Sequence, residues 1–215
     1  YRESSVRAFL RNDTTAQVRI GGLLYLPKHA AGPVPAVIIA HTSGGMQAVD
    51  REVAEAMNAA GFAALAYDSY IPRGTADVHR GGGMLAVMHQ TADAFAALRA
   101  LAADPRIDAR RIAILGMSAG GGAAILSASA PAYRNLAGGQ APRFAAHVAF
   151  YPGMHIAPSA ETLTGAPMLI MVGENDDYQK PRRTALWVEH VKRTAPAAPV
   201  ELRLVAGAPH SFLNS

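Results

Sequence analysis

Short apolar runs alternate along this chain with longer segments in which apolar residues recur at helical spacing. The strand-length apolar runs occupy residues 36–40, 62–67, 112–115, 144–151, 168–172 and 200–205. Continuous apolar runs of this length are typical of strands that are buried on both faces of a sheet. Residues 17–26 include alternating polar and apolar side chains until Pro27, which predicts one further strand near the start.

The segments between these runs have the periodicity of helices. We predict helices at residues 50–60, 84–102, 119–128 and 183–193. Strands that alternate with helices form a mostly parallel central sheet with helices on both faces, so the pattern predicts the α/β class. No repeat or low-complexity linker divides the chain, and we expect residues 1–215 to form one domain. In such a sheet the reactive loops gather at the carboxyl ends of the strands.

Composition and charge narrow the class of protein. Half of the residues are hydrophobic and 17% are charged, which is typical of a folded globular chain. No apolar run approaches the roughly 20 residues that span a bilayer, so we predict no membrane partner. The net charge is +4, but the arginine pairs at 110–111 and 182–183 have no interleaved aromatic residues, so we also predict no nucleic-acid partner. The absence of cysteine excludes disulfides, thiolate metal sites and a cysteine nucleophile.

The sharpest motif is Gly-Met-Ser-Ala-Gly at residues 116–120, between a predicted strand and a predicted helix. A G-x-S-x-G turn exposes its serine above the sheet, which makes Ser118 the candidate nucleophile. Glycine is needed at both ends because side chains there would collide where the helix and the strand pass closely. The Ala119 N–H lies at the helix start, where it can point at a developing oxyanion. The alternative is a glycine-rich packing turn without chemistry.

A serine hydroxyl is a weak nucleophile and needs a base whose pKa lies near neutrality, usually a histidine. Among eight histidines, His210 follows the last predicted strand in a short loop, Gly-Ala-Pro-His-Ser-Phe. His41 also lies at a strand end and is the main competitor, although it precedes the nucleophile in the chain. We expect His147, in an apolar strand, and His190, on a helix, to be packed or exposed rather than catalytic.

Three acidic residues follow the predicted strand at 168–172 and are candidates for the group that orients the base: Glu174, Asp176 and Asp177. The chain order serine, acid, histidine is that of α/β-hydrolases and differs from the chymotrypsin and subtilisin orders. The alternative for this cluster is a polar turn in which an aspartate caps the following helix, and Asp177 is the candidate for that cap.

The sequence resembles the dienelactone hydrolase family of α/β-hydrolases over nearly its whole length. The matching segments are VIIAHTSGG, GFAALAYDSYIPRG, DPRIDARRIAILGMSAGG, VAFYPG, PMLIMVGENDD and VAGAPHSF. The resemblance implies the α/β-hydrolase fold, with Asp176 as the acid and His210 as the base. It also implies oxyanion donors in the backbone N–H groups of Ala119 and of the loop after His41, where Ser43 is our choice. From these segments we assign to substrate binding the residues Thr42, Met117, Arg73 and Tyr151.

Departures from the family pattern change the expected substrate. Enzymes that hydrolyse dienelactone have a cysteine nucleophile and a glutamate in the oxyanion loop, whereas this chain has Ser118 and Thr42 there. The resemblance therefore argues against dienelactone itself. Arg73 falls near a position where the family binds a substrate carboxylate and is a candidate for binding an anionic group. The alternative is that Arg73 and Arg80 are ordinary solvent-facing loop residues.

The residues at the two ends of the chain lead to two further predictions. The first residue is Tyr1 rather than Met, which fits a cleaved signal peptide or a shortened chain, in a periplasmic, secreted or cytoplasmic protein. The chain stops five residues after His210, where relatives add a closing helix. We therefore expect this C-terminal helix to be absent and the base to lie near a frayed terminus.

Together these features predict a serine hydrolase that cleaves small-molecule carboxylic esters by acyl transfer through Ser118, without a cofactor or a metal. The preference for esters over amides rests on analogy with the family. The alternatives are a peptidase or amidase that uses the same residues and a non-catalytic binding protein of the same fold. A metal hydrolase is the weakest alternative, because no histidine pair has the i, i+4 spacing of metal ligands.

Overall fold

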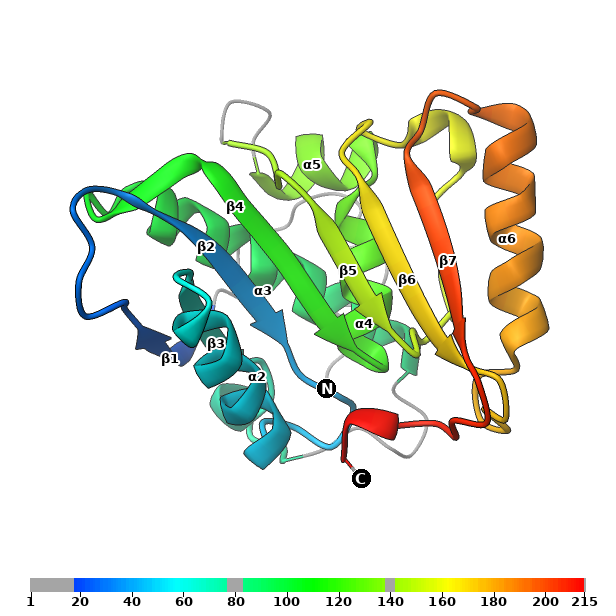
Figure 1. Ribbon diagram of the computed structural model, residues 1–215, viewed down its shortest axis with the longest axis horizontal. Coiled ribbons are helices and arrows are strands. Elements are labelled where there is room, and N and C mark those ends of the chain that lie inside the picture. The colour runs from blue at the N-terminus through cyan, green and yellow to red at the C-terminus, as the bar shows by residue number, and fades with distance from the viewer. Residues whose placement is uncertain (1–17, 77–82, 138–141, 215) are drawn as a thin grey trace.

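The fold is a twisted, open sheet between two layers of helices (Figure 1). The computed structural model describes residues 18–76, 83–137 and 142–214. The elements in these residues are, in chain order, β1 (Gly21–Tyr25), β2 (Val34–Ala40), α2 (Ala48–Ala59), β3 (Ala63–Asp68), η1 (Ile71–Arg73), α3 (Gly83–Ala102), β4 (Ile107–Met117), α4 (Ala119–Ser127), α5 (Ala130–Ala137), β5 (His147–Phe150), η2 (Ala160–Thr162), β6 (Met168–Gly173), α6 (Pro181–Thr194), β7 (Val200–Val205) and η3 (Phe212–Asn214). No helix in this part of the chain combines the length and the apolarity needed to cross a bilayer.

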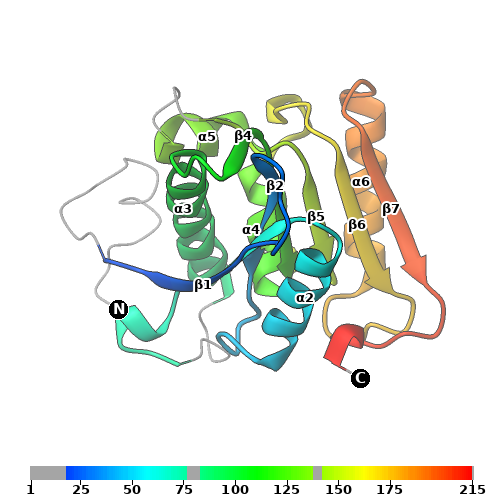
Figure 2. The ribbon, with the colours of Figure 1, turned by 60° about the vertical axis from the view of Figure 1, so that its left-hand side comes forward.

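Seven strands in the described residues form one sheet in the order β1-β3-β2-β4-β5-β6-β7. Neighbouring strands run parallel except at the β1 edge, where β1 pairs antiparallel with β3. The sheet is therefore mostly parallel, as predicted. The arrows of β2 and of β4 to β7 end at the lower edge of the sheet in Figure 1, and Figure 2 shows the C-terminal turn η3 at this same edge. The loops that follow these strands therefore meet at one place.

Both faces of the central strands are buried, which explains their continuous apolar runs. Along β2, Ala36, Ile38 and Ala40 pack in one cluster with residues of α3, α4, α5 and α6. The alternate residues Val37 and Ile39 pack in a second cluster with residues of α2. In the view of Figure 1, α2 lies in front of the sheet, whereas α3 and α4 lie behind it. The prediction of helices on both faces is confirmed.

Some of the predicted strand and helix boundaries differ from those in the structure. Strand β4 begins at Ile107, five residues before the predicted start at residue 112, because the exposed Arg110 and Arg111 interrupt its apolar run. Strand β5 covers only residues 147–150 of the predicted segment 144–151. Helix α5 was not predicted, because it follows α4 after a short break and continues a stretch of small residues.

The start of α4 lies so close to β2 that no side chain fits at Gly120. A Cβ atom on Gly120 would lie 2.0 Å from the Ala40 carbonyl oxygen, and one on Gly116 would lie 2.0 Å from the Gly120 carbonyl oxygen. The Gly120 N–H donates to the His41 carbonyl oxygen at 3.1 Å. The predicted need for glycine at both ends of the serine motif is confirmed.

A buried carboxyl group lies in the first turn of α2. Asp50 is 1% exposed, and its Oδ2 accepts a hydrogen bond from the Gln47 N–H at 2.7 Å. Burial raises the pKa of Asp50 from 3.8 to about 6. Between these two pH values the folded state binds more protons than the unfolded state, so the free energy of unfolding falls as the pH rises. Asp50 therefore destabilises the fold above this range.

Replacing Gly120 by Ala is expected to destabilise the fold, because the new Cβ overlaps a backbone carbonyl that cannot move independently of the sheet. Overpacking costs about 1–3 kcal/mol of the free energy of unfolding, and a clash between backbones belongs at the upper end. Urea unfolding followed by circular dichroism measures the loss. Gly21→Ala is the matched control, because a Cβ there has no heavy atom within 4 Å. Equal losses in the two variants would contradict the packing argument.

Replacing Asp50 by Asn should remove the destabilisation that begins when this carboxyl group ionises. We expect the stability of Asp50→Asn relative to the parent chain to rise between pH 3.8 and about 6 and then to level off. Urea unfolding at a series of pH values measures this difference. Glu52→Gln, at an exposed position of the same helix, controls for the loss of a surface carboxylate. A relative stability of Asp50→Asn that stays constant over this range would show the assignment to be wrong.

Candidate active site

Ser118 occupies a strained turn between β4 and α4. Its φ is 52° and its ψ is −110°, a conformation that costs a residue with a Cβ about 1–3 kcal/mol. Backbone hydrogen bonds hold the turn in place: the Ser118 N–H donates to Phe150 at 3.0 Å, and the Ser118 carbonyl accepts from Gly122 at 3.0 Å and Gly153 at 2.6 Å. This is the geometry that a strand-to-helix turn needs to present a serine hydroxyl.

The imidazole of His210 lies between Ser118 and Asp176. Its Nε2 is 3.2 Å from the Ser118 Oγ, and its Nδ1 is 2.8 Å from the Asp176 Oδ2. A carboxylate accepts hydrogen bonds, so the neutral ring carries its proton on Nδ1 and leaves Nε2 as the acceptor facing the serine. The structure thus brings together the three side chains that the sequence singled out, with the ring between the other two.

The Asp176 carboxylate is fixed by its own turn. Its side chain has 0% exposure, and Oδ1 accepts from the backbone N–H groups of Tyr178 at 3.0 Å and Gln179 at 2.8 Å. These bonds leave Oδ2 for His210. The neighbouring Asp177 is exposed, and no side-chain hydrogen bond from the described residues caps α6, so the predicted capping role of Asp177 is wrong. The backbone N–H groups just before α6 are instead bound by Asp176.

Hydrogen bonds join the loop after β6 to the loop that carries His210. Oε2 of Glu174, the third acidic candidate, accepts from the Gly207 N–H at 3.2 Å. The Asn175 N–H donates to the Ala208 carbonyl at 2.9 Å. The two loops are therefore held at a fixed distance, although the residues they carry are far apart in the sequence.

Aromatic rings hold the His210 imidazole in its plane. The Tyr151 ring meets it edge-on with 5.0 Å between centroids, and the Tyr178 ring lies at the same distance in a tilted arrangement. Tyr151 is fully buried and also packs against Phe212 at 5.1 Å. Burial raises the pKa of Tyr151 above its ordinary value, so its phenol stays protonated. Tyr151, predicted to bind substrate, is placed behind the base as its support.

The loop after β2 lies beside the start of α4, because the His41 carbonyl accepts the Gly120 N–H. Within the loop, the Thr42 carbonyl accepts from the Gly45 N–H at 3.3 Å, and the Thr42 Oγ1 accepts from the Gly44 N–H at 3.2 Å. Thr42, predicted to bind substrate, thus closes its own loop. The Ala119 N–H lies in the first turn of α4, where it has no acceptor within the helix.

Two other assignments to substrate binding are corrected by the structure. The Arg73 guanidinium forms a bidentate ion pair with Asp93 on α3, with bonds of 2.7 Å and 2.8 Å. Its charge is compensated and its side chain is only 16% exposed, so it is neither an anion-binding residue nor a solvent-facing one. Met117 has 0% exposure and packs in the core cluster with α2, where its side chain has no surface to offer a substrate. Arg80 lies outside the described residues.

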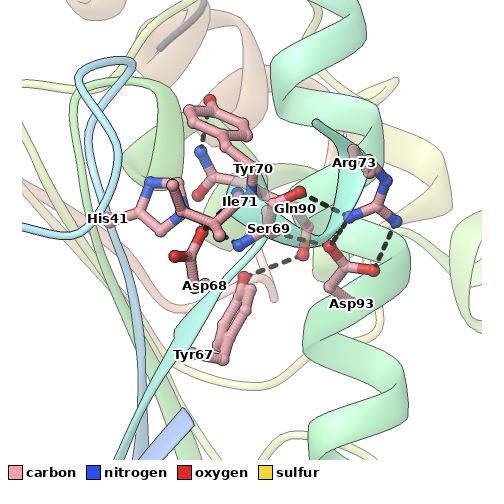
Figure 3. Close-up of polar contacts among 9 residues, drawn as sticks. All are labelled: His41, Tyr67, Asp68, Ser69, Tyr70, Ile71, Arg73, Gln90 and Asp93. Atoms are coloured by element: carbon pink, nitrogen blue, oxygen red, sulfur yellow. Dashed lines mark hydrogen bonds and ion pairs between the residues drawn. The ribbon is translucent and has the colours of Figure 1, made fainter. Parts of the chain in front are cut away.

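The main competitor for the role of base, His41, is engaged elsewhere (Figure 3). Its Nε2 accepts a hydrogen bond from the Ser69 N–H at 3.1 Å, and its Nδ1 is 2.7 Å from the Thr42 carbonyl oxygen. Burial lowers the pKa of His41, which favours a neutral ring. No sequence pattern indicates that Ser69 contacts both His41 and Asp93, because the three residues come from separate parts of the chain. The position of His41 at a strand end was the one usable signal.

Comparisons with known proteins bear on the family and the fold of this chain. A family model described as the dienelactone hydrolase family matches residues 20–215, and no curated protein matches the chain. The chain is similar to a solved structure of a candidate dienelactone hydrolase from Klebsiella pneumoniae, at 22% identity and a TM-score of 0.68 over 92% of this chain and 89% of that one. It is also similar to P91, a dienelactone hydrolase-like promiscuous phosphotriesterase from metagenomic libraries, at 24% identity and a TM-score of 0.65 over 91% and 79% of the two chains.

A further solved structure is esterase 2 of Thermogutta terrifontis phosphorylated by paraoxon. It has 22% identity and a TM-score of 0.68, over 94% of this chain and 82% of that one. At such identities the likeness concerns the fold, and it confirms the predicted α/β-hydrolase architecture. The family model covers residues 20–215, which include all seven strands of the described sheet. The chain therefore belongs to the dienelactone hydrolase family.

Proposed function

We propose that this chain is a serine esterase in which Ser118, His210 and Asp176 form the catalytic triad. The observation that carries the proposal is the bridging imidazole, which lies 3.2 Å from the Ser118 Oγ and 2.8 Å from the Asp176 Oδ2. The strained backbone of Ser118 and the complete burial of the Asp176 side chain support it. Membership of the dienelactone hydrolase family supports the cleavage of carboxylic esters by these residues.

In the first half of the proposed reaction, the Ser118 Oγ attacks the ester carbonyl while the His210 Nε2 takes the hydroxyl proton. The Asp176 carboxylate stabilises the imidazolium that results. The tetrahedral intermediate then collapses, the bond to the leaving alkoxide breaks, and His210 returns the proton to that oxygen. The alcohol leaves, and the acyl group stays on Ser118.

In the second half, His210 takes a proton from a water molecule, and the water oxygen attacks the acyl carbonyl. Collapse of the second tetrahedral intermediate breaks the bond to Ser118, which recovers its proton from His210, and the carboxylic acid leaves. The backbone N–H groups of Ala119 and Ser43 are the proposed donors to the oxyanion in both halves. The steps need no cofactor.

The structural neighbours support the choice of an organophosphate as a probe of this site. One is described as a promiscuous phosphotriesterase, and the other as an esterase phosphorylated by paraoxon. Paraoxon places a phosphoryl centre where an ester carbonyl would react. Slow hydrolysis of the resulting phosphorylated serine would leave the nucleophile blocked. We infer that paraoxon phosphorylates Ser118 of this chain, and that ester turnover falls in proportion to the fraction of the protein that is phosphorylated.

Ser118→Ala should lower kcat for a p-nitrophenyl ester by about 10⁴ to 10⁶-fold, because no other group supplies the nucleophile. The release of p-nitrophenol measures the rate. Ser159→Ala, at an exposed position with no side-chain capping bond, is the matched control and should keep the parent rate. A Ser118→Ala variant that hydrolyses the ester at the parent rate would remove the basis of the proposal.

Asp176→Asn should lower kcat by about 10³ to 10⁴-fold, because an amide no longer fixes the tautomer or stabilises the imidazolium. Asp177→Asn is the matched control, since this neighbour is exposed and its carboxylate does not contact His210 in the structure. We expect it to retain the parent kcat. A larger loss of kcat in Asp177→Asn than in Asp176→Asn would show that the assignment of the acid to Asp176 is wrong.

A further inference from the structure

A buried chain of polar contacts leads from α3 to the start of the loop after β2 (Figure 3). In the sheet, β2 and β3 lie on the opposite side of β4 from β6, the strand that precedes Asp176. Asp93 on α3 binds Arg73 through both carboxylate oxygens, at 2.7 Å and 2.8 Å. The same carboxylate accepts the Ser69 hydroxyl at 2.6 Å, and Arg73 also donates to the Ser69 carbonyl at 2.6 Å. Ser69 is therefore held at its side chain and at its backbone by one ion pair.

Ser69 in turn determines which nitrogen of His41 carries a proton. The Ser69 N–H lies 3.1 Å from the His41 Nε2, and a backbone N–H can only donate. Nε2 must therefore be unprotonated, which places the proton of the neutral ring on Nδ1. From there it is donated to the Thr42 carbonyl oxygen, 2.7 Å away. The Tyr70 ring meets the imidazole edge-on at 4.5 Å and limits its rotation.

The Thr42 carbonyl belongs to the same peptide unit as the Ser43 N–H. This unit is planar, and in a trans peptide the carbonyl and the N–H point in opposite directions; the described residues contain no cis peptide bond. A hydrogen bond that fixes the Thr42 carbonyl toward His41 therefore also fixes the direction of the Ser43 N–H. The second acceptor bond of that carbonyl, from the Gly45 N–H at 3.3 Å, acts in the same sense.

We propose that Arg73, Asp93, Ser69 and His41 are positioning residues that aim the Ser43 N–H at the oxyanion. The inference rests on the proposed function in one respect, the role of Ser43 as an oxyanion donor. It gives Arg73 a task other than binding an anionic substrate, because both of its terminal nitrogens are committed to Asp93. The ion pair acts on the reaction through Ser69 and His41 and touches no reacting atom.

Substitution of His41 tests the proposal directly, because Asn and Gln each place an amide group near only one of the two ring nitrogens. Asn places its amide near the position of Nδ1, where it can donate to the Thr42 carbonyl. Gln places its amide near the position of Nε2, where it meets the Ser69 N–H and misses the Thr42 carbonyl. We expect His41→Gln to lower kcat for a p-nitrophenyl ester by about 10²-fold with little change in KM, as a displaced oxyanion donor would. His41→Asn should recover at least tenfold of that loss.

The far end of the chain of contacts is tested by removing both charges of the ion pair together. In Arg73→Gln/Asp93→Asn we expect kcat to fall about tenfold and KM to change less than threefold, because the oxyanion is a feature of the transition state. The matched control is Arg203→Gln/Glu201→Gln, which removes an exposed ion pair of 2.6 Å on β7. A parent value of kcat in Arg73→Gln/Asp93→Asn, or a rise in KM with kcat unchanged, would overturn the proposal.

A readout that does not use catalysis separates this inference from the proposed function. In ¹⁵N NMR spectra, the Arg73→Gln/Asp93→Asn variant should show faster exchange of the Gly45 amide proton and loss of the single Nδ1–H tautomer of His41. If the parent chain shows no ester turnover but the variant changes in this way, the esterase proposal fails and the coupling to the loop stands. If the exchange rate and the tautomer stay as in the parent, the coupling is wrong whatever the activity. Should the double variant not fold, the His41→Asn and His41→Gln pair decides through kcat and the exchange rate of the Gly45 amide proton.

Discussion

The close approach of α4 to β2 is the contact on which the whole site depends. At Gly120 the helix comes within a distance that excludes even a methyl group, with a hypothetical Cβ 2.0 Å from the Ala40 carbonyl oxygen. This contact forces the chain to turn sharply between β4 and α4, and Ser118 takes the positive φ of that turn. The cost of about 1–3 kcal/mol for this conformation is offset by burial of α4, whose residues are buried along its whole length.

The same contact brings two separate loops to the serine. The Gly120 N–H binds the His41 carbonyl, so the loop after β2 is fixed relative to the start of α4. On the other side, backbone bonds between the loops after β6 and β7 hold Asp176 at His210. Parallel strands that end at one edge make this convergence possible, because every loop concerned follows the carboxyl end of a strand. Backbone hydrogen bonds therefore position the loops that carry the polar side chains of the site.

Much of this arrangement was predictable from the sequence, for reasons that differ between elements. The central strands were found because both of their faces are buried, which leaves continuous apolar runs such as the one in β2. Ser118 and His210 were predicted because each follows a strand, in the chain order typical of α/β-hydrolases. The choice of Asp176 among three acidic residues came from the resemblance to the dienelactone hydrolase family. Strand β4 was predicted too short, since its first residues include the exposed Arg110 and Arg111.

The contacts of Arg73 and Met117 were not predictable in this way. Whether Arg73 faces a substrate or an aspartate depends on where α3 places Asp93, twenty residues away, and no local pattern encodes that pairing. Met117 lies beside the serine in the sequence, but strand alternation turns its side chain into the core with α2. In both cases the position near a motif suggested substrate binding, whereas the packing of the surrounding elements directs the side chain elsewhere.

Covalent labelling is the most direct measurement of the central claim that His210 and Asp176 activate Ser118. The parent chain would be treated with a fluorophosphonate, digested and analysed by mass spectrometry. We predict a single adduct on the peptide that contains Ser118, formed far more slowly in a His210→Ala variant. An unmodified Ser118 in a chain that still hydrolyses esters, or labelling that proceeds equally fast without the imidazole, would contradict it.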